Sequence, residues 1–273
     1  MAGACSIPEV RSDRVPTSSH GHRRAAHAGH RGSRPAPTVP EGRTVPEAGR
    51  VHRAGRQTMP TAPEESGPPM PRGRYSLHDP HDHTPLGEEH FHCAPGPSGW
   101  RYVSQLTTPA GDHAGSVDLA VDELGRPIRL EINASNWQVR GAALDGVTWV
   151  RTDPTGTHAT EGNAPAHAFS GTSPAFLVST ARLLRLTPAS PATRVRLVTF
   201  TDPVLAPRTV DQSWALVRSE AHATDNGPLT VDEYQVSALD TGEQHAVHLT
   251  GDVVLAAPGI ELEDLDSPPS AFS

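Results

Sequence analysis

The segment HDPHDHTPLGEEHFHC, residues 78–93, carries an unusual density of groups that bind metal ions. It holds five histidines, one cysteine and four acidic side chains in sixteen positions. Imidazole, thiolate and carboxylate groups are the usual protein ligands of zinc, iron and manganese. Whether they form a site depends on whether the chain places them on elements that can hold them together.

Three residues of this segment, His81, His83 and Glu88, are spaced as H-x-H-x4-E, which is similar to the first half of a cupin motif. A cupin places such ligands on adjacent barrel strands. Pro80 and Pro85 bracket the two histidines, however, and no P-x-G stretch with a following histidine completes the motif downstream. We therefore favour a solvated histidine-rich linker without metal or other cofactor, and keep a cupin-like metal-dependent enzyme as the alternative.

Motifs for nucleophilic catalysis are missing from the sequence. The stretch SGTSPAF lacks the G-x-S-x-G elbow, and Ser173 is better explained as a helix cap than as the nucleophile of a triad with His167 and Asp153. All 23 basic residues are arginine, which excludes Schiff-base chemistry, pyridoxal phosphate anchoring and the P-loop lysine. With no H-E-x-x-H or C-x-x-C either, the sequence favours a protein that is not an enzyme.

Large aromatic side chains and arginines form the remaining candidate site. A curved sheet with a helix on its concave side can hold an apolar molecule, and guanidinium groups suit anionic or polar headgroups. We place a pocket between the helix and the first strands, with Arg140 or Arg151 at its mouth. Core packing of the aromatics and solvation of the arginines are the alternative. The residues assigned to ligand binding are Trp137, Arg140, Trp149, Arg151, Phe176, Leu183 and Trp214, and further arginine anchors are Arg182, Arg185, Arg194 and Arg196.

The elements that must position these residues are mainly short strands. In the stretch 117–121 apolar residues alternate with polar ones, and Ile128, Leu130 and Ile132 alternate in the same way, which is typical of half-buried antiparallel strands. Turn sequences at 122–127 and 144–147 indicate hairpins. Further strands are expected at TRVRLVTF, SWALVRS, DEYQVSAL, HAVHLT and DVVLAA. The stretch EHFHC could be a short first strand with its histidines on one face.

One segment has helical spacing instead. Ser173 is a suitable N-cap, Pro174 fits the first turn, and apolar residues recur three and four positions apart up to Leu184. We expect a helix over about 174–185. The predicted fold is a curved antiparallel sheet, half barrel or roll, with this helix packed on its concave side.

The first 74 residues differ in composition from the remainder. They carry twelve of the 23 arginines but six of the 31 acidic residues, with no apolar periodicity. We expect a disordered leader over 1–74, or residues upstream of a true start at Met59 or Met70. A basic arm that binds nucleic acid is the less favoured interpretation. A histidine-rich linker or first strand then spans 75–98, a β-rich ligand-binding domain 99–265 and a disordered tail 266–273.

The cysteine count and the hydropathy pattern bear on the compartment. Cys5 and Cys93 are too few for a disulfide framework, so a cytoplasmic location is expected. No apolar run approaches the roughly twenty residues of a membrane helix. The exclusive use of arginine is typical of a GC-rich, actinobacterium-like genome.

The order of segments over 99–262 resembles the bacterial glycolipid-binding family, a group of β-rich domains. The similarity lies in the GW pair at 99–100, in SVDLAVDELGRPIRLEINASNWQVRG at 116–141 and in the stretch 171–217. The family's T-N-T is Val178-Ser179-Thr180 here, and its tyrosine in the v-p-v-Q-r-Y element is Trp214. The resemblance implies a lipid-carrier-like half barrel that binds a lipid, a glycolipid or a similar amphiphilic small molecule. It implies no catalytic residue.

Overall fold

The computed structural model describes residues 70–96, 98–224 and 227–270. Its strands are β1 (Arg72–His78), β2 (Pro85–Gly96), β3 (Gly99–Thr107), β4 (His113–Asp122), β5 (Pro127–Ala134), β6 (Trp137–Ala143), β7 (Val147–Thr152), β8 (Ala159–Ala164), β9 (Ala168–Ser170), β10 (Thr193–Thr201), β11 (Ala206–Thr224), β12 (Gly227–Ala238), β13 (Gln244–Thr250), β14 (Val253–Ala257) and β15 (Ile260–Leu265). Its helix is α1 (Pro174–Leu184).

All fifteen strands form one sheet. Strands β1 to β8 are an antiparallel meander, strands β10 to β15 are a second one, and the two meet where β1 pairs with β15. Strand β9 pairs parallel with β10 and forms one edge, while β8 forms the other. Because β8 and β9 follow one another in the chain, the curved sheet brings its two edges near each other while it stays unclosed. The predicted mainly β fold is confirmed.

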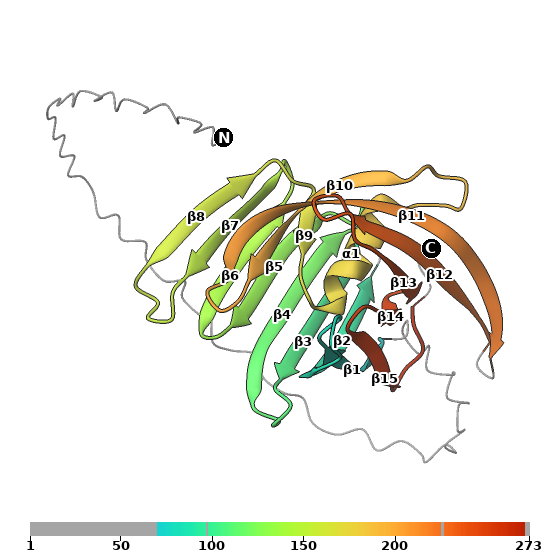
Figure 1. Ribbon diagram of the computed structural model, residues 1–273, viewed down its shortest axis with the longest axis horizontal. Coiled ribbons are helices and arrows are strands. Elements are labelled where there is room, and N and C mark those ends of the chain that lie inside the picture. Colours follow the sequence, from blue (N-terminus) through green and yellow to red (C-terminus); the bar gives the residue numbers. More distant parts are fainter. Residues whose placement is uncertain (1–69, 97, 225–226, 271–273) are drawn as a thin grey trace, which may run out of the picture. The chain divides into compact units, whose positions relative to one another are not determined.

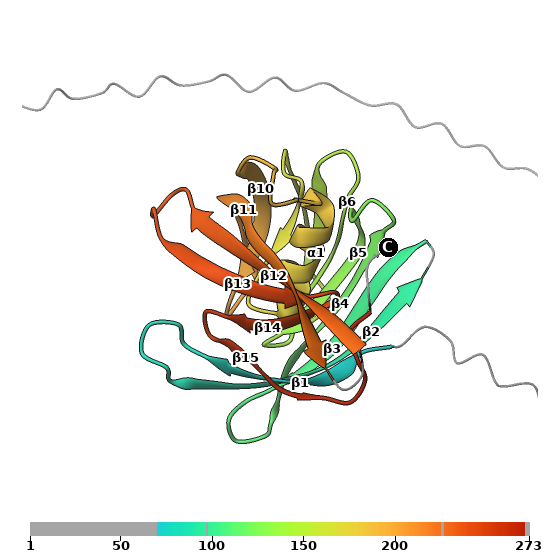
Figure 2. The same ribbon diagram turned by 90° about the vertical axis from the view of Figure 1, so that its right-hand side faces the viewer.

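Helix α1 lies on the concave side of this sheet, as the two views show (Figures 1 and 2). It contacts β4, β9 and β14. Ser173 is the N-cap, and its Oγ accepts a hydrogen bond from the Ala175 N–H at 3.3 Å. The helix ends at Leu184, and the C-cap residue Arg185 adopts a left-handed conformation with φ 47°. The predicted helix, its cap and its position are therefore confirmed.

The apolar alternation predicted for two strands holds in one and fails in part of the other. The side chains of Val117, Leu119 and Val121 on β4 are buried, as predicted. Ile128 is 46% exposed, so its predicted burial is wrong. Val121 pairs with Pro127 but the preceding Ala120 pairs with Arg129, which leaves Ile128 as the extra residue of a β-bulge. A bulge reverses the side-chain direction at one position, and the sequence alone carries no sign of it here.

The sheet begins before the predicted start of the ligand-binding domain. Strand β2 covers most of the histidine-rich segment, so the first-strand alternative applies to much of 75–98. On β2, His90 and His92 are exposed while Phe91 and Cys93 are buried, which confirms the faces predicted for EHFHC. The predicted disordered leader lies outside the described residues up to position 69, and its predicted end at 74 is wrong because β1 begins at Arg72.

The core on the concave face contains a ladder of aromatic rings. Tyr75 of β1, Phe91 of β2 and Tyr102 of β3 stack in sequence, with ring centroids 4.7 and 5.6 Å apart, and Trp100 lies 5.7 Å beyond Tyr102. Offset stacking of this kind adds to the free energy of burial. This ladder fills the concave side near the strand pair that joins the two meanders.

Candidate functional site

Trp137 and Arg151, both predicted to line the pocket, contact each other. The Arg151 guanidinium lies 4.8 Å from the centroid of the Trp137 ring, and its Nη1 donates to the Val204 carbonyl oxygen at 3.2 Å. Both side chains are half-buried. A cation over an indole face is attracted by the ring quadrupole, so this geometry favours packing between the strands over a charged lip for a ligand.

This contact predicts the effect of changing Arg151. We expect Arg151→Gln to lower the free energy of unfolding by about 0.5–1 kcal/mol, the usual size of a weakly buried cation–π contact. A double-mutant cycle with Trp137→Leu, followed by urea denaturation, measures the coupling between the two side chains. A coupling energy near zero would contradict the stacking role.

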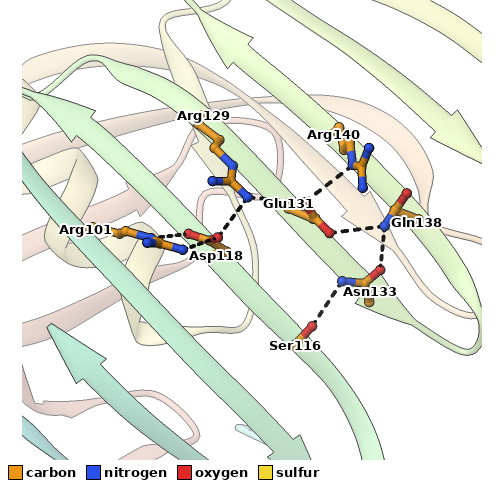
Figure 3. Close-up of polar contacts among 8 residues, drawn as sticks. All are labelled: Arg101, Ser116, Asp118, Arg129, Glu131, Asn133, Gln138 and Arg140. Carbon is orange, nitrogen blue, oxygen red and sulfur yellow. Dashed lines mark hydrogen bonds and ion pairs between the residues drawn. The ribbon is translucent and has the colours of Figure 1, made fainter. Parts of the chain in front are cut away.

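Arg140 lies on the convex face of the sheet, away from the core. Its neighbour Val139 is fully buried, whereas the Arg140 side chain is 65% exposed. Its Nε lies 3.4 Å from Glu131 Oε2. From there a chain of ion pairs continues through Arg129 and Asp118 to Arg101 and so crosses β6 to β3 (Figure 3). Surface pairs of this kind contribute little to stability, and none of them encloses a ligand.

The remaining predicted residues are packed in the core in separate places. Trp149 of β7 meets the Phe200 ring edge-on at 5.9 Å, and Trp214 meets Tyr234 edge-on at 5.7 Å. Phe176 on α1 is buried, and Leu183 packs against the core from the helix. None of the seven residues assigned to ligand binding is among those that line the pocket described next. Their role in binding stays a prediction.

A pocket of 380 Å³ lies at the C-terminal end of α1, and we call it the helix-end pocket. It opens between the helix end, the turn from β4 to β5, and strands β12 and β13. Its lining residues are Glu123 and Gly125 of the turn, Ala181, Arg182 and Arg185 of the helix end, Asp232 and Tyr234 of β12, and Leu249 and Gly251 at the end of β13. Arg182 and Arg185 belong to the set of arginine anchors that the sequence predicted.

The turn from β4 to β5 is fitted closely to the end of α1. Gly125 has φ 79°, and a Cβ at this position would lie 2.6 Å from the Arg182 carbonyl carbon, so only glycine fits. Asp122 Oδ1 accepts hydrogen bonds from the backbone N–H groups of Leu124 and Arg126 and holds the turn. The Arg185 guanidinium donates to the Glu123 carbonyl oxygen. One wall of the pocket is thus fixed by backbone contacts.

Arg182 connects the pocket to the polar core. Its guanidinium lies 5.7 Å from the Trp100 ring centroid, and the Trp100 indole N–H donates to Asp252 Oδ2 at 3.3 Å. The backbone N–H of Ser270 donates to Asp252 Oδ1 at 2.8 Å, so part of the segment predicted as a disordered tail is held against the sheet. Burial raises the pKa of the Asp252 carboxyl and lowers the pKa of Arg182.

Sequence reasoning missed Asp252 and the role of Trp100 beside it. The only signal was the placement of a single acid directly before the apolar run VVLAA. Its partners come from positions about 150 residues earlier and about 20 later. A local pattern cannot reveal contacts at such separations.

The structure does not gather the predicted metal ligands. His81 and His83 lie in the turn between β1 and β2, and both are exposed. Glu88 on β2 is paired with Arg74 Nη1 at 2.6 Å and with His90 Nε2 at 3.4 Å. Among the residues that the structure describes, no group of three or more His, Cys, Asp or Glu side chains is arranged to hold a metal ion. The cupin-like alternative gains no support from this geometry.

The residues of the alternative triad have other partners. Ser173 caps α1 and donates to a buried carboxyl, described below. His167 shares contacts with the Arg196 backbone, and Asp153 accepts hydrogen bonds from Thr155 within its own turn. Each side chain is therefore explained by its local structure.

Comparison with known proteins adds no relative. No protein-family model, no curated protein and no solved structure matches the chain.

At eleven residues, α1 is too short to cross a bilayer, and the described part of the chain holds no other helix.

Proposed function

We propose that this protein binds an amphiphilic small molecule with an uncharged, hydroxyl-rich headgroup, such as a glycolipid, in the helix-end pocket and without catalysis. The observation that carries the proposal is the lining of that pocket, which combines an apolar wall with equal numbers of acidic and basic side chains. The resemblance of residues 99–262 to the glycolipid-binding family supports the same ligand class.

The size and apolar wall of the pocket suit part of a small amphiphile. Its 380 Å³ falls within the range of about 300–1,000 Å³ that is usual for ligand sites. Tyr234 is buried with its ring against Trp214, and Leu249 and Ala181 are buried beside the opening. A rigid aromatic ring and two aliphatic side chains give a ligand apolar contact area at little entropic cost.

The polar lining favours a neutral headgroup. Arg182 and Arg185 bring two positive charges, and Glu123 and Asp232 bring two negative ones. A headgroup of either charge therefore meets a side chain of its own sign within the same small space. A hydroxyl group donates and accepts, so a sugar can use guanidinium and carboxylate partners together.

Three probes with the same octyl chain test this assignment. We expect octyl β-glucoside, below its micelle concentration, to bind at least about tenfold more tightly than octyl phosphate or octyltrimethylammonium, as one additional hydrogen bond would give. Isothermal titration calorimetry measures the three affinities. Equal affinities would contradict the headgroup assignment, and no binding of any probe would contradict the binding function.

Two charge-neutralising variants locate the site. Arg185→Gln leaves the lining negative and should improve binding of octyltrimethylammonium, whereas Asp232→Asn leaves it positive and should improve binding of octyl phosphate. Arg140→Gln removes the same charge on the convex face and is the matched control. A control variant that shifts the probe affinities as much as Arg185→Gln would place the site elsewhere.

A further inference from the structure

Glu89 of β2 is a carboxyl group in the middle of the core. Its side chain is fully buried, and it faces the same side of the sheet as Phe91 and Cys93. Buried acidic groups normally pair with a base or a metal ion, because an isolated charge in an apolar medium is very unfavourable. This residue was not singled out by its sequence context and has no place in the helix-end pocket.

The two oxygens of this carboxyl have different surroundings. Oε1 accepts hydrogen bonds from Tyr102 Oη at 2.9 Å and from Ser173 Oγ at 2.6 Å. Oε2 is buried and makes no hydrogen bond, and the same is true of Ser104 Oγ. The Ser104 hydroxyl nevertheless lies near enough to act on the carboxyl. Ser104 pairs with Phe91 across β2 and β3, so these two unpaired buried atoms, one of them able to carry a proton, belong to side chains on the same face of neighbouring strands.

Among the residues that the structure describes, no cationic side chain is placed to compensate a negative charge on this carboxyl. The titratable groups of the elements packed here are Tyr75 on β1, Cys93 on β2, Tyr102 on β3, Asp252 after β13 and Arg182 on α1. The arginine acts on Cys93 and Asp252, and in the described part of the chain no cation is among the groups that act on Glu89. Burial raises the pKa of the Glu89 carboxyl more than its hydrogen bonds lower it.

We propose that Glu89 is a neutral carboxylic acid in the folded protein, that its Oε2–H donates to Ser104 Oγ, and that its Oε1 holds the N-terminal end of α1 through Ser173. This arrangement satisfies both unpaired atoms with one proton. It also fits the N-cap, because Ser173 Oγ donates its proton to Glu89 and keeps a lone pair for the Ala175 N–H. The carboxyl is thus a proton-dependent latch between β2, β3 and the helix.

The latch opens when the proton leaves to solvent at higher pH. The resulting carboxylate would be buried without a counter-charge, so ionisation is coupled to separation of α1 from β2 and β3. The opposite end of the same helix carries Arg182 and Arg185 of the helix-end pocket. A pH effect on ligand affinity rests on the proposed function, whereas the protonation state of Glu89 does not.

The direction of the stability effect follows from linkage. The pKa of Glu89 is raised on folding, so folding takes up a proton at any pH between the unfolded and the folded pKa. The stabilisation is complete below the unfolded pKa and is lost as pH rises toward the folded pKa. Over that window the folding equilibrium constant should fall by up to about tenfold for each pH unit through this one group.

Glu89→Gln tests the latch, because an amide is neutral at every pH and keeps both a donor and an acceptor. We expect urea denaturation between pH 4 and 9 to show a folding constant that falls less steeply with pH in Glu89→Gln than in the wild type. The variant should also be more stable than the wild type at the alkaline end. Glu161→Gln, at an exposed position of β8, is the matched control and should follow the wild-type profile. Parallel profiles for the wild type and Glu89→Gln would overturn the proposal.

A second measurement works even if the glutamine variant does not fold. The infrared band of a protonated carboxyl should be present in the wild type at neutral pH. In Ser104→Ala this band should disappear at a lower pH than in the wild type, because the acceptor of the acid proton is gone. If Glu89 were ionised with Ser104 donating to it, the same substitution would raise the pKa and shift the transition the other way. That opposite shift, or the absence of the band at neutral pH, would overturn the proposal independently of any ligand.

Discussion

Replacing Phe169 with alanine is expected to lower the free energy of unfolding by about 3–5 kcal/mol, the usual cost of truncating a fully buried aromatic side chain. Phe169 is fully buried on β9, its ring centroid lies 6.2 Å from that of Phe200, and a Cβ on Gly141 would come within 2.9 Å of its Cζ. Strand β9 pairs with β10 through three residue pairs. The ring therefore packs this edge against β6 of the other meander at Gly141.

Urea denaturation measures this loss. Leu144→Ala is the control, because Leu144 lies in the turn after β6 and is 59% exposed, so its truncation should change stability by less than about 0.5 kcal/mol. A loss below about 1 kcal/mol for Phe169→Ala would mean that the two edges are held together by other contacts.

Replacing Asp252 with alanine should cost about 2–5 kcal/mol, because two buried donors lose their acceptor at once. The Trp100 indole N–H and the Ser270 backbone N–H both donate to this carboxylate. Burial lowers the pKa of Arg182 at the helix-end pocket, and the Asp252 charge that partly offsets this effect is lost as well. We therefore expect weaker octyl β-glucoside binding together with the lower stability.

Asp252→Asn separates the loss of the negative charge from the loss of the hydrogen-bond acceptor. The amide oxygen can still accept one of the two hydrogen bonds, so we expect a smaller loss of stability than in Asp252→Ala. Asp240→Ala is the control, since Asp240 is exposed and lies 4.0 Å from its ion-pair partner Arg208. Chemical denaturation followed by tryptophan fluorescence measures the stability of each variant and checks this predicted order. Equal stability of Asp252→Ala and the control would contradict a structural role for this carboxylate.

Local patterns in the sequence predicted most elements of the fold. The alternation around Leu119, the cap at Ser173 and the histidine faces of EHFHC depend on neighbours within a few residues, and all agree with the structure. Strand β8 was not predicted, because its sequence ATEGNA has no apolar alternation and its residues are exposed or half-buried. The β-bulge at Ile128 was missed because bulges depend on the pairing of two strands.

The candidate site was harder to predict, because its residues meet only through long-range pairing. The lining runs from Glu123 to Gly251, and those segments come together once β1 pairs with β15 and α1 enters the concave side. The sequence indicated arginine anchors, and two of them, Arg182 and Arg185, line the pocket. It could not indicate that Arg140 points to the convex face toward Glu131.

The most direct test of binding in the helix-end pocket is an intermolecular nuclear Overhauser experiment on methyl-labelled protein with octyl β-glucoside. Ala181 and Leu249 line the pocket, whereas Val150 and Val217 are exposed on the surface and report nonspecific association. We predict cross-peaks from the probe to the Ala181 and Leu249 methyl groups and none to those of Val150 and Val217. Cross-peaks confined to the surface valines, or no cross-peak at a probe concentration that saturates binding, would contradict the proposed site.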